Sequence, residues 1–193
     1  MIRRAAAAWT AAALALALGA AGSIACGRRD APTGADRTRA DEEERAEEAV
    51  VERRRVTLWL PGAAGRLAPV EAEIESAPEP RARIAALVAA LLAAEAEGDA
   101  VALFPVAVEL SAVLPTADGT LYLDLRRADG GEPPGAGSTL ETQRVYAIVH
   151  TLTHNEPSVE RVVLLWNGEQ RLSFSGHLDT SRPLHPRPEL EPR

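Results

Sequence analysis

Residues 138–168 read STLETQRVYAIVHTLTHNEPSVERVVLLWNG and predict, in order, a helix, a strand and a tight turn. Ser138 precedes the helical pattern and Glu141 follows three residues later, which is typical of a capping box at a helix start. The helix is expected to end between Asn155 and Pro157, because proline cannot continue it. The residues expected to face the core are Leu140, Val145, Ile148, Val149 and Leu152.

The strand and turn that follow this helix predict a β-hairpin. Val159–Trp166 is rich in residues that favour strands, and Asn167-Gly168 is a strong signal for a two-residue hairpin turn. We therefore expect residues 170–174 to return beside the first strand.

Upstream residues predict the rest of an α+β domain. Strands are expected at 56–60, 66–76, 106–114 and 121–125, and a helix at 81–97, bounded by Pro80 and Gly98. The turn signal Asp118-Gly119 makes the third and fourth of these strands an antiparallel pair. The whole predicts a small mixed or antiparallel sheet with two helices packed on one face, in the order β-α-β-β-α-β-β, within residues 55–184. Residues 185–193 are expected to form a proline-rich, extended tail.

The first 25 residues have the pattern of an export signal. Arg3 and Arg4 precede the uncharged, alanine-rich run Ala5–Ala21. The next stretch, Gly22–Cys26, resembles the bacterial lipoprotein signal, in which cleavage precedes a cysteine that is then acylated with groups such as palmitate. We therefore expect Cys26 to carry a lipid anchor. There are two alternatives: an ordinary secretory signal with a free cysteine, and a retained transmembrane helix.

Residues 26–54 predict a charged, flexible tether between this anchor and the domain. They include the run Asp41–Glu48, and their charge is too high and their apolar content too low for a packed core. The expected location is the cell envelope, with the chain attached to a membrane on its extracytoplasmic side.

Composition excludes several classes of function. The chain carries 21 basic and 28 acidic residues, for a net charge of −7, which argues against a nucleic-acid partner. Cys26 is the single cysteine, which excludes a disulfide scaffold and any metal site built from several thiolates.

Two histidines raise the alternative of a periplasmic metal-dependent hydrolase. His150 and His154 are four residues apart on the expected helix, as in a helical zinc site. However, Thr151 occupies the position of the glutamate base of a metalloprotease, and a third ligand would have to be His177 or Glu156. We expect the two histidines to be polar residues near the helix end, outside the core stripe, and we assign no metal ligand or cofactor.

Two further groups were weighed as sites. Ser175, His177 and Asp179 suggest a catalytic triad, but alternate residues of an extended segment are about 6–7 Å apart, too far for a hydrogen-bond relay. We therefore expect no catalytic residue. Four aromatic side chains on strands could form an exposed recognition patch or pack beneath the helices, and we favour packing. These are Trp59, Tyr122, Trp166 and Phe174.

The combined pattern resembles the GerMN family of sporulation, germination and other envelope lipoproteins. The resemblance lies in 56–61, 121–125, 146–153 with its Thr-Leu-Thr ending, 162–168, and 176–184 with its Asp-x-Ser-x-Pro-Leu feature. It implies a small α/β unit, similar to the ring-building modules of envelope machines, that mediates protein contacts without catalysis. The expected partners are a membrane, through the lipid, and an envelope protein or a second copy.

Overall fold

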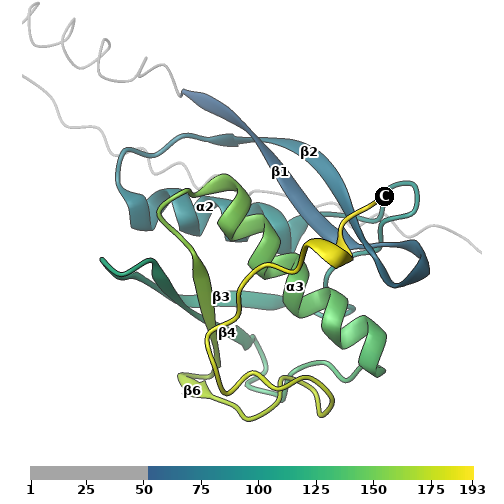
Figure 1. Cartoon of the computed structure of the whole chain (residues 1–193). Coiled ribbons are helices and arrows are strands. Elements are labelled where there is room, and N and C mark those ends of the chain that lie inside the picture. Colours follow the sequence, from purple (N-terminus) through teal and green to yellow (C-terminus); the bar gives the residue numbers. More distant parts are fainter. Residues whose placement is uncertain (1–51) are drawn as a thin grey trace, which may run out of the picture. The chain divides into compact units, whose positions relative to one another are not determined.

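The computed structural model describes residues 52–193 (Figure 1). The predicted signal, Cys26 and nearly all of the predicted tether lie outside the described residues. The elements are β1 (Arg53–Pro61), η1 (Ala63–Gly65), β2 (Leu67–Glu75), α2 (Pro80–Ala93), β3 (Val108–Pro115), β4 (Thr120–Arg127), α3 (Ser138–Asn155), β5 (Arg161–Trp166), β6 (Glu169–Gln170) and η2 (Pro188–Leu190).

Two helices lie between two sheets. β1 and β2 form a two-stranded antiparallel sheet, and the other sheet has the order β3-β4-β5-β6. α2 contacts β1, β2 and β3, while α3 contacts β1, β2 and β5, so that both helices touch both sheets (Figure 1). The core between the layers includes Leu58, Leu60, Ile84, Leu87, Leu91, Leu121, Leu123, Leu125, Ile148, Leu152 and Leu164. The predicted α+β class is confirmed, and the strand expected at 66–76, which the predicted element order omitted, is β2.

The four-stranded sheet is mixed. β3 pairs antiparallel with β4, as predicted, with a bulge between Leu110 and Ala112. β4 pairs parallel with β5, because α3 carries the chain back to the starting end of the sheet. Asn167 and Gly168 both have positive φ, the conformation of a type I′ turn, which confirms the predicted hairpin. Its second strand is shorter than predicted, because only Glu169 and Gln170 pair with β5.

Several predicted boundaries were wrong. β1 includes Arg53 and Arg54, which were assigned to the tether, because both pair with β2. α2 ends at Ala93 rather than near Glu97. Glu95, Glu97 and Asp99 follow this end and are exposed, and acidic side chains at a helix C-terminus oppose the helix dipole.

The predicted capping box is absent. Gly137 is the N-cap of α3 and no side chain caps the helix start. Instead, the carboxylate of Glu141 turns away from the helix end to bind a loop near the C-terminus, which leaves it unavailable to Ser138.

α3 is buried on more faces than one apolar stripe provides. Val145, Ile148, Val149 and Leu152 are buried as predicted, but Leu140 is only partly buried. Polar side chains on the other faces are buried too: Glu141, Gln143, Arg144, His150 and Thr151. The cause is the central position of α3, which is covered by β1 on one side, by β5 on another and by the C-terminal residues on a third.

Candidate interaction surface

β3 offers the longest open edge in the part of the chain that the structure describes. It is the first strand of the four-stranded sheet, and the opposite edge strand, β6, contains only two residues. Part of the β3 edge is already engaged, because Nε of Arg81 in α2 donates a hydrogen bond to the carbonyl of Val113 at 3.1 Å. Val113 itself is buried, whereas the other residues from Val108 to Leu114 are exposed or half-buried, so the edge is accessible on both sides of this contact.

The edge of β1, in contrast, is closed by a polar seam on α3, which consists of Gln143, Thr151 and Asn155. The side-chain amide of Asn155 accepts from the backbone N–H of Thr57 at 3.1 Å and donates to its carbonyl at 2.7 Å, as a neighbouring strand would. Thr151 Oγ1 accepts from the backbone N–H of Trp59 at 2.9 Å. Gln143 extends the seam by donating to the carbonyls of the β1–β2 turn.

The outer edge of β2 is guarded by its own residues. Pro69 lacks a backbone donor, and the exposed residues that alternate along the strand after it are Glu71, Glu73 and Glu75. Proline and charged side chains are the usual means by which an edge strand resists pairing. Among the long strands of residues 52–193, β3 is therefore the one whose edge is open to a partner.

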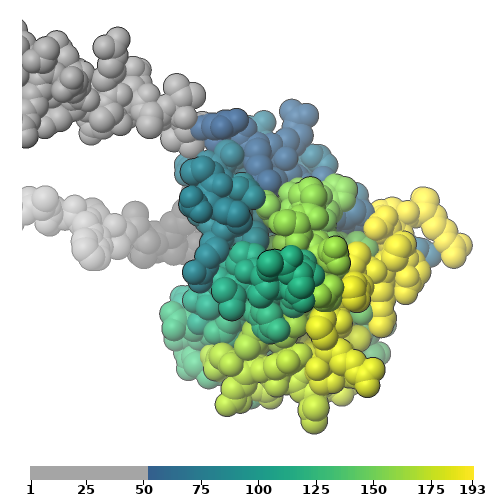
Figure 2. All heavy atoms as spheres, turned by 60° about the vertical axis from the view of Figure 1, so that its left-hand side comes forward, coloured from purple at the N-terminus to yellow at the C-terminus, as the bar shows by residue number. Residues whose placement is uncertain are grey.

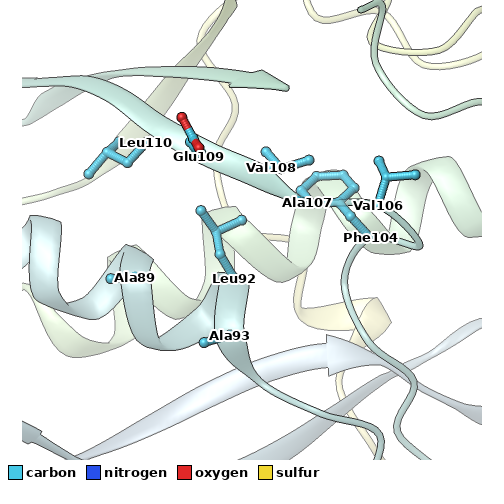
Figure 3. A pocket seen from close by; sticks show the side chains of 9 residues that line it. All are labelled: Ala89, Leu92, Ala93, Phe104, Val106, Ala107, Val108, Glu109 and Leu110. Carbon is cyan, nitrogen blue, oxygen red and sulfur yellow. The ribbon is translucent and has the colours of Figure 1, made fainter. Parts of the chain in front are cut away.

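A shallow apolar groove, the β3 groove, lies between α2 and this edge. It has a volume of about 430 Å³ and is lined by Ala89, Leu92, Ala93, Phe104, Val106, Ala107, Val108, Glu109 and Leu110. Figure 3 shows Leu92 projecting from α2 toward β3, whereas Glu109, the one charged residue of the lining, points away from the helix. The groove thus presents small and apolar side chains beside a strand edge.

Aromatic packing fixes the floor of the β3 groove. The ring of Phe104 stacks on Phe174 at a centroid distance of 6.1 Å, and Phe174 packs edge-on against Trp166 at 5.6 Å. The guanidinium of Arg144 lies 5.9 Å from the centroid of Phe104, and its Nη1 donates to the carbonyl of Pro134 at 3.3 Å. These contacts hold Phe104, one of the lining residues, in place.

The other face of the same strand carries a second apolar feature. Leu114 of β3 is 52% exposed and lies directly opposite Tyr122 of β4, which is 40% exposed. Their neighbours Val113 and Leu123 are buried, so this pair lies on the face of the sheet opposite the helices. The favoured packing role holds for Trp59, Trp166 and Phe174, which are buried, but not for Tyr122.

A buried carboxylate organises the loop that holds Phe174. Glu141, with no exposed surface, accepts hydrogen bonds from the backbone N–H groups of Ser175, His177 and Leu178 at 2.7, 2.9 and 3.2 Å. Ser173 Oγ also donates to it at 3.3 Å. Burial alone would raise the pKa of Glu141, but these hydrogen bonds together lower it below its ordinary value.

The structure separates the three residues that suggested a triad. Nδ1 of His177 donates to Glu141 at 2.9 Å, whereas Asp179 accepts from the backbone and hydroxyl of Ser181. The hydroxyl of Ser175 donates to the carbonyl of Pro134. Sequence reasoning missed Glu141 as the partner of His177, because its position beside Ser138 suggested a helix cap.

His150 and His154 differ in environment. His150 is only 2% exposed, which contradicts its predicted position outside the core, whereas His154 is exposed. Both rings pack edge-on against Trp59, at centroid distances of 5.6 and 6.1 Å. Glu156 forms ion pairs with Arg54 and Arg83, and no group of three potential metal ligands occurs within residues 52–193.

Neither helix within residues 52–193 combines the length and the apolar content needed to cross a bilayer.

The family of the chain follows from comparison with known proteins. The Germane family model, described as sporulation and spore germination, matches residues 57–172. A search of the curated proteins gave no match. The solved tandem GerMN domains of the sporulation protein GerM from Bacillus subtilis share the fold with a TM-score of 0.50 at 17% identity, over 69% of this chain and 46% of that chain.

Two other solved structures are similar at lower TM-scores. The first GerMN domain of the same Bacillus subtilis protein matches with a TM-score of 0.43 at 17% identity, over 69% of this chain and 98% of that chain. A structure described as "Putative Lipoprotein from Clostridium perfringens" matches with a TM-score of 0.49 at 18% identity, over 70% and 89%. Since the family model covers more than half of the sequence, the chain belongs to the Germane family and carries a GerMN-type domain.

Proposed function

We propose that this chain is an envelope lipoprotein whose GerMN domain binds a partner protein and catalyses no reaction. The sequence supports the anchor, because Cys26 follows an export signal and the small residues that precede a lipoprotein cleavage site. The family description supports a role in a sporulation- or germination-type assembly. The observation that carries the binding role is the β3 groove beside an open strand edge.

The proposed mode of binding is addition of an extended segment to β3. A peptide that pairs with this edge would gain backbone hydrogen bonds, and its alternate side chains would point to opposite faces of the sheet. One set would enter the β3 groove over Phe104 and Leu92. The other set would lie near Leu114. The partner segment is therefore expected to be extended, with apolar side chains at alternate positions.

Two exposed alanines of α2 provide a matched test of this site. Ala89 lines the groove, whereas Ala82 lies near the start of the same helix and outside the lining. A photo-crosslinking amino acid at position 89 of the full chain, expressed in its host envelope, should give a discrete adduct, and the same group at position 82 should not. Equal adducts at both positions, or none at 89, would contradict groove binding.

A charged substitution in the β3 groove tests the same binding site with the crosslinker placed elsewhere. Ala89→Glu places a carboxylate in the apolar groove and should abolish the adduct formed from a second crosslinking position at Leu114, while Ala82→Glu should preserve it. Thermal unfolding of both variants checks that each remains folded. An adduct with the mass of two chains would identify the partner as a second copy.

The anchor has its own test. Cys26→Ser should move the chain from the membrane fraction to the soluble fraction, and mass spectrometry of the wild-type protein should find an acylated N-terminal cysteine. An unmodified Cys26 in a membrane-free protein would contradict the anchor but not the groove.

A further inference from the structure

The C-terminal residues form a strap across α3. The strap consists of residues 184–191. It starts at Leu184, whose backbone exchanges two hydrogen bonds with Val162 at 2.8 and 2.9 Å. It then crosses α3 and forms η2 close to the β1–β2 turn (Figure 1), and its yellow atoms lie against the green atoms of α3 in Figure 2. Apart from η2, the tail predicted for residues 185–193 is extended; residues 185–189 are exposed, and Leu190 and Glu191 are partly buried.

The centre of the strap is fastened to a buried imidazole. The backbone N–H of Arg187 donates to Nε2 of His150 at 2.9 Å, and Nδ1 of His150 lies 3.3 Å from Oε1 of Glu191. His150 is buried between the strap and the rings of Trp59 and Tyr146, which lie at centroid distances of 5.6 and 6.5 Å. The strap therefore covers this part of the helix.

Two arginines complete the attachment. The guanidinium of Arg187 lies 4.5 Å from the centroid of Tyr146, within the range of a cation–π contact. Nη1 of Arg66, from the β1–β2 turn, donates to the carbonyls of Glu189 and Glu191, both at 2.9 Å. Neither contact depends on a group that titrates between pH 5 and 8.

The hydrogen bond at Nε2 defines the protonation state of His150. Because Nε2 accepts the Arg187 N–H, it carries no proton, and the ring proton resides on Nδ1, facing Glu191. A second proton on the ring would make Nε2 a donor facing the N–H of Arg187, which is also a donor, so this hydrogen bond would be lost. The attachment of the strap at Arg187 is therefore compatible with neutral imidazole alone.

The groups around His150 shift its pKa in opposite directions, and the effect of burial is the largest. Desolvation lowers the pKa of His150, whereas the carboxylates of Glu191 and Glu189 and the backbone of Arg187 favour the charged form, and the net shift is downward from 6.5. Tyr146 lies beside the His150 ring and carries the Arg187 cation on its own ring, and the exposed His154 of the same helix packs against Trp59, which also contacts His150. Glu191 is partly exposed, so solvent screens its attraction.

We propose that protonation of His150 releases the strap from α3 and uncovers Tyr146 and His150. Because the released state binds protons more readily than the docked state, docking is complete above pH 6.5 and weakens as the pH falls below that value. With an ordinary histidine pKa in the released state, the docking equilibrium falls by up to about 30-fold between pH 7.5 and pH 5.

Hydrogen exchange on the full chain in detergent micelles tests this proposal. Peptides that cover residues 184–191 should exchange faster at pH 5 than at pH 7.5, after correction for the intrinsic pH dependence of exchange, while β4 stays protected. His150→Gln keeps an acceptor near the position of Nε2 but cannot titrate, so its strap should stay protected at pH 5. The matched control is His154→Gln, which should retain the wild-type response.

Each outcome decides the proposal. Equal strap protection at both pH values in the wild type would overturn it, as would a response that persists in His150→Gln or disappears in His154→Gln. If His150→Gln unfolds, shown by exchange throughout β4, Glu191→Gln replaces it. This variant removes a carboxylate that favours the imidazolium, so the strap should open at a higher pH than in the wild type. An unchanged midpoint would count against the role of His150.

Discussion

Oε2 of Glu141 lies 2.9 Å from both the backbone nitrogen and Nδ1 of His177, so one helical carboxylate orders a loop 36 residues further along the chain. Oε1 of the same side chain accepts from Ser175 and Leu178. This loop also carries Phe174, on which Phe104 stacks in the floor of the β3 groove. Glu141 therefore links the interior of the domain to the proposed binding surface.

Replacing Glu141 by Gln should destabilise the domain by about 2–4 kcal/mol, because three backbone donors lose a charged acceptor in a buried site. Urea unfolding of the full chain measures the change. Glu169→Gln on the exposed hairpin is the control and should alter stability by less than about 0.5 kcal/mol. A similar loss in both variants would show that the hydrogen bonds of Glu141 contribute little.

The contribution of Glu141 should depend on pH. Its pKa is lowered in the folded protein, because hydrogen bonds to the carboxylate outweigh burial, so the stabilisation is complete above the ordinary value of 4.5. It is lost as the pH falls through the lowered folded-state pKa. Acid unfolding followed by circular dichroism should show the wild type and Glu141→Gln converging as the pH falls progressively below 4.5. Parallel curves would contradict this assignment.

Thr151 and Thr153 form a matched pair on α3. Thr151 Oγ1 accepts from the buried backbone N–H of Trp59, whereas the hydroxyl of Thr153 bonds within its own helix to the carbonyl of Val149. Thr151→Val should therefore cost about 1–3 kcal/mol of unfolding free energy, because it leaves a buried donor without an acceptor. Thr153→Val should cost less than 1 kcal/mol. Chemical unfolding measures the free energy of both variants. Equal losses of stability would show that the hydrogen bond from Thr151 to β1 is not the cause.

The β3–β4 turn contains an unusually acidic side chain. Hydrogen bonds, led by the one from the Thr116 hydroxyl, lower the pKa of Asp118 from 3.8 to about 2. Carboxyl resonances followed by NMR should report this value in the wild type. Thr116→Val should return it toward 3.8, and a titration unmoved by this substitution would show that the turn does not hold the carboxylate as described.

Local patterns in the sequence were sufficient to predict the elements whose structure depends on residues close by in the chain. The Asn167-Gly168 turn, the antiparallel pairing of β3 with β4, and the apolar residues Val145 to Leu152 of α3 follow from turn chemistry and periodicity. The GerMN resemblance drew on the order of these elements and is confirmed by the family match.

Long-range contacts account for the predictions that were wrong. Glu141 pairs with residues 32 to 37 positions away, and His150 is buried by a strap that begins 34 residues later. Neither separation leaves a local signal in the sequence. A hint was available: a carboxylate and a histidine among apolar residues of one helix require partners when buried. The β3 groove is lined by the last turn of α2, and periodicity placed the end of that helix near Glu97 rather than at Ala93.

The closed edges of β1 and β2 restrict what larger assembly this domain can build. If two copies joined symmetrically through β3, each would occupy the other's only long open strand edge within residues 52–193. Such a pair could not bind a third copy through the same edge. A ring or filament would need a head-to-tail contact between two different surfaces of each subunit. Counting the subunits in a complex would therefore reveal which of these geometries the domain uses.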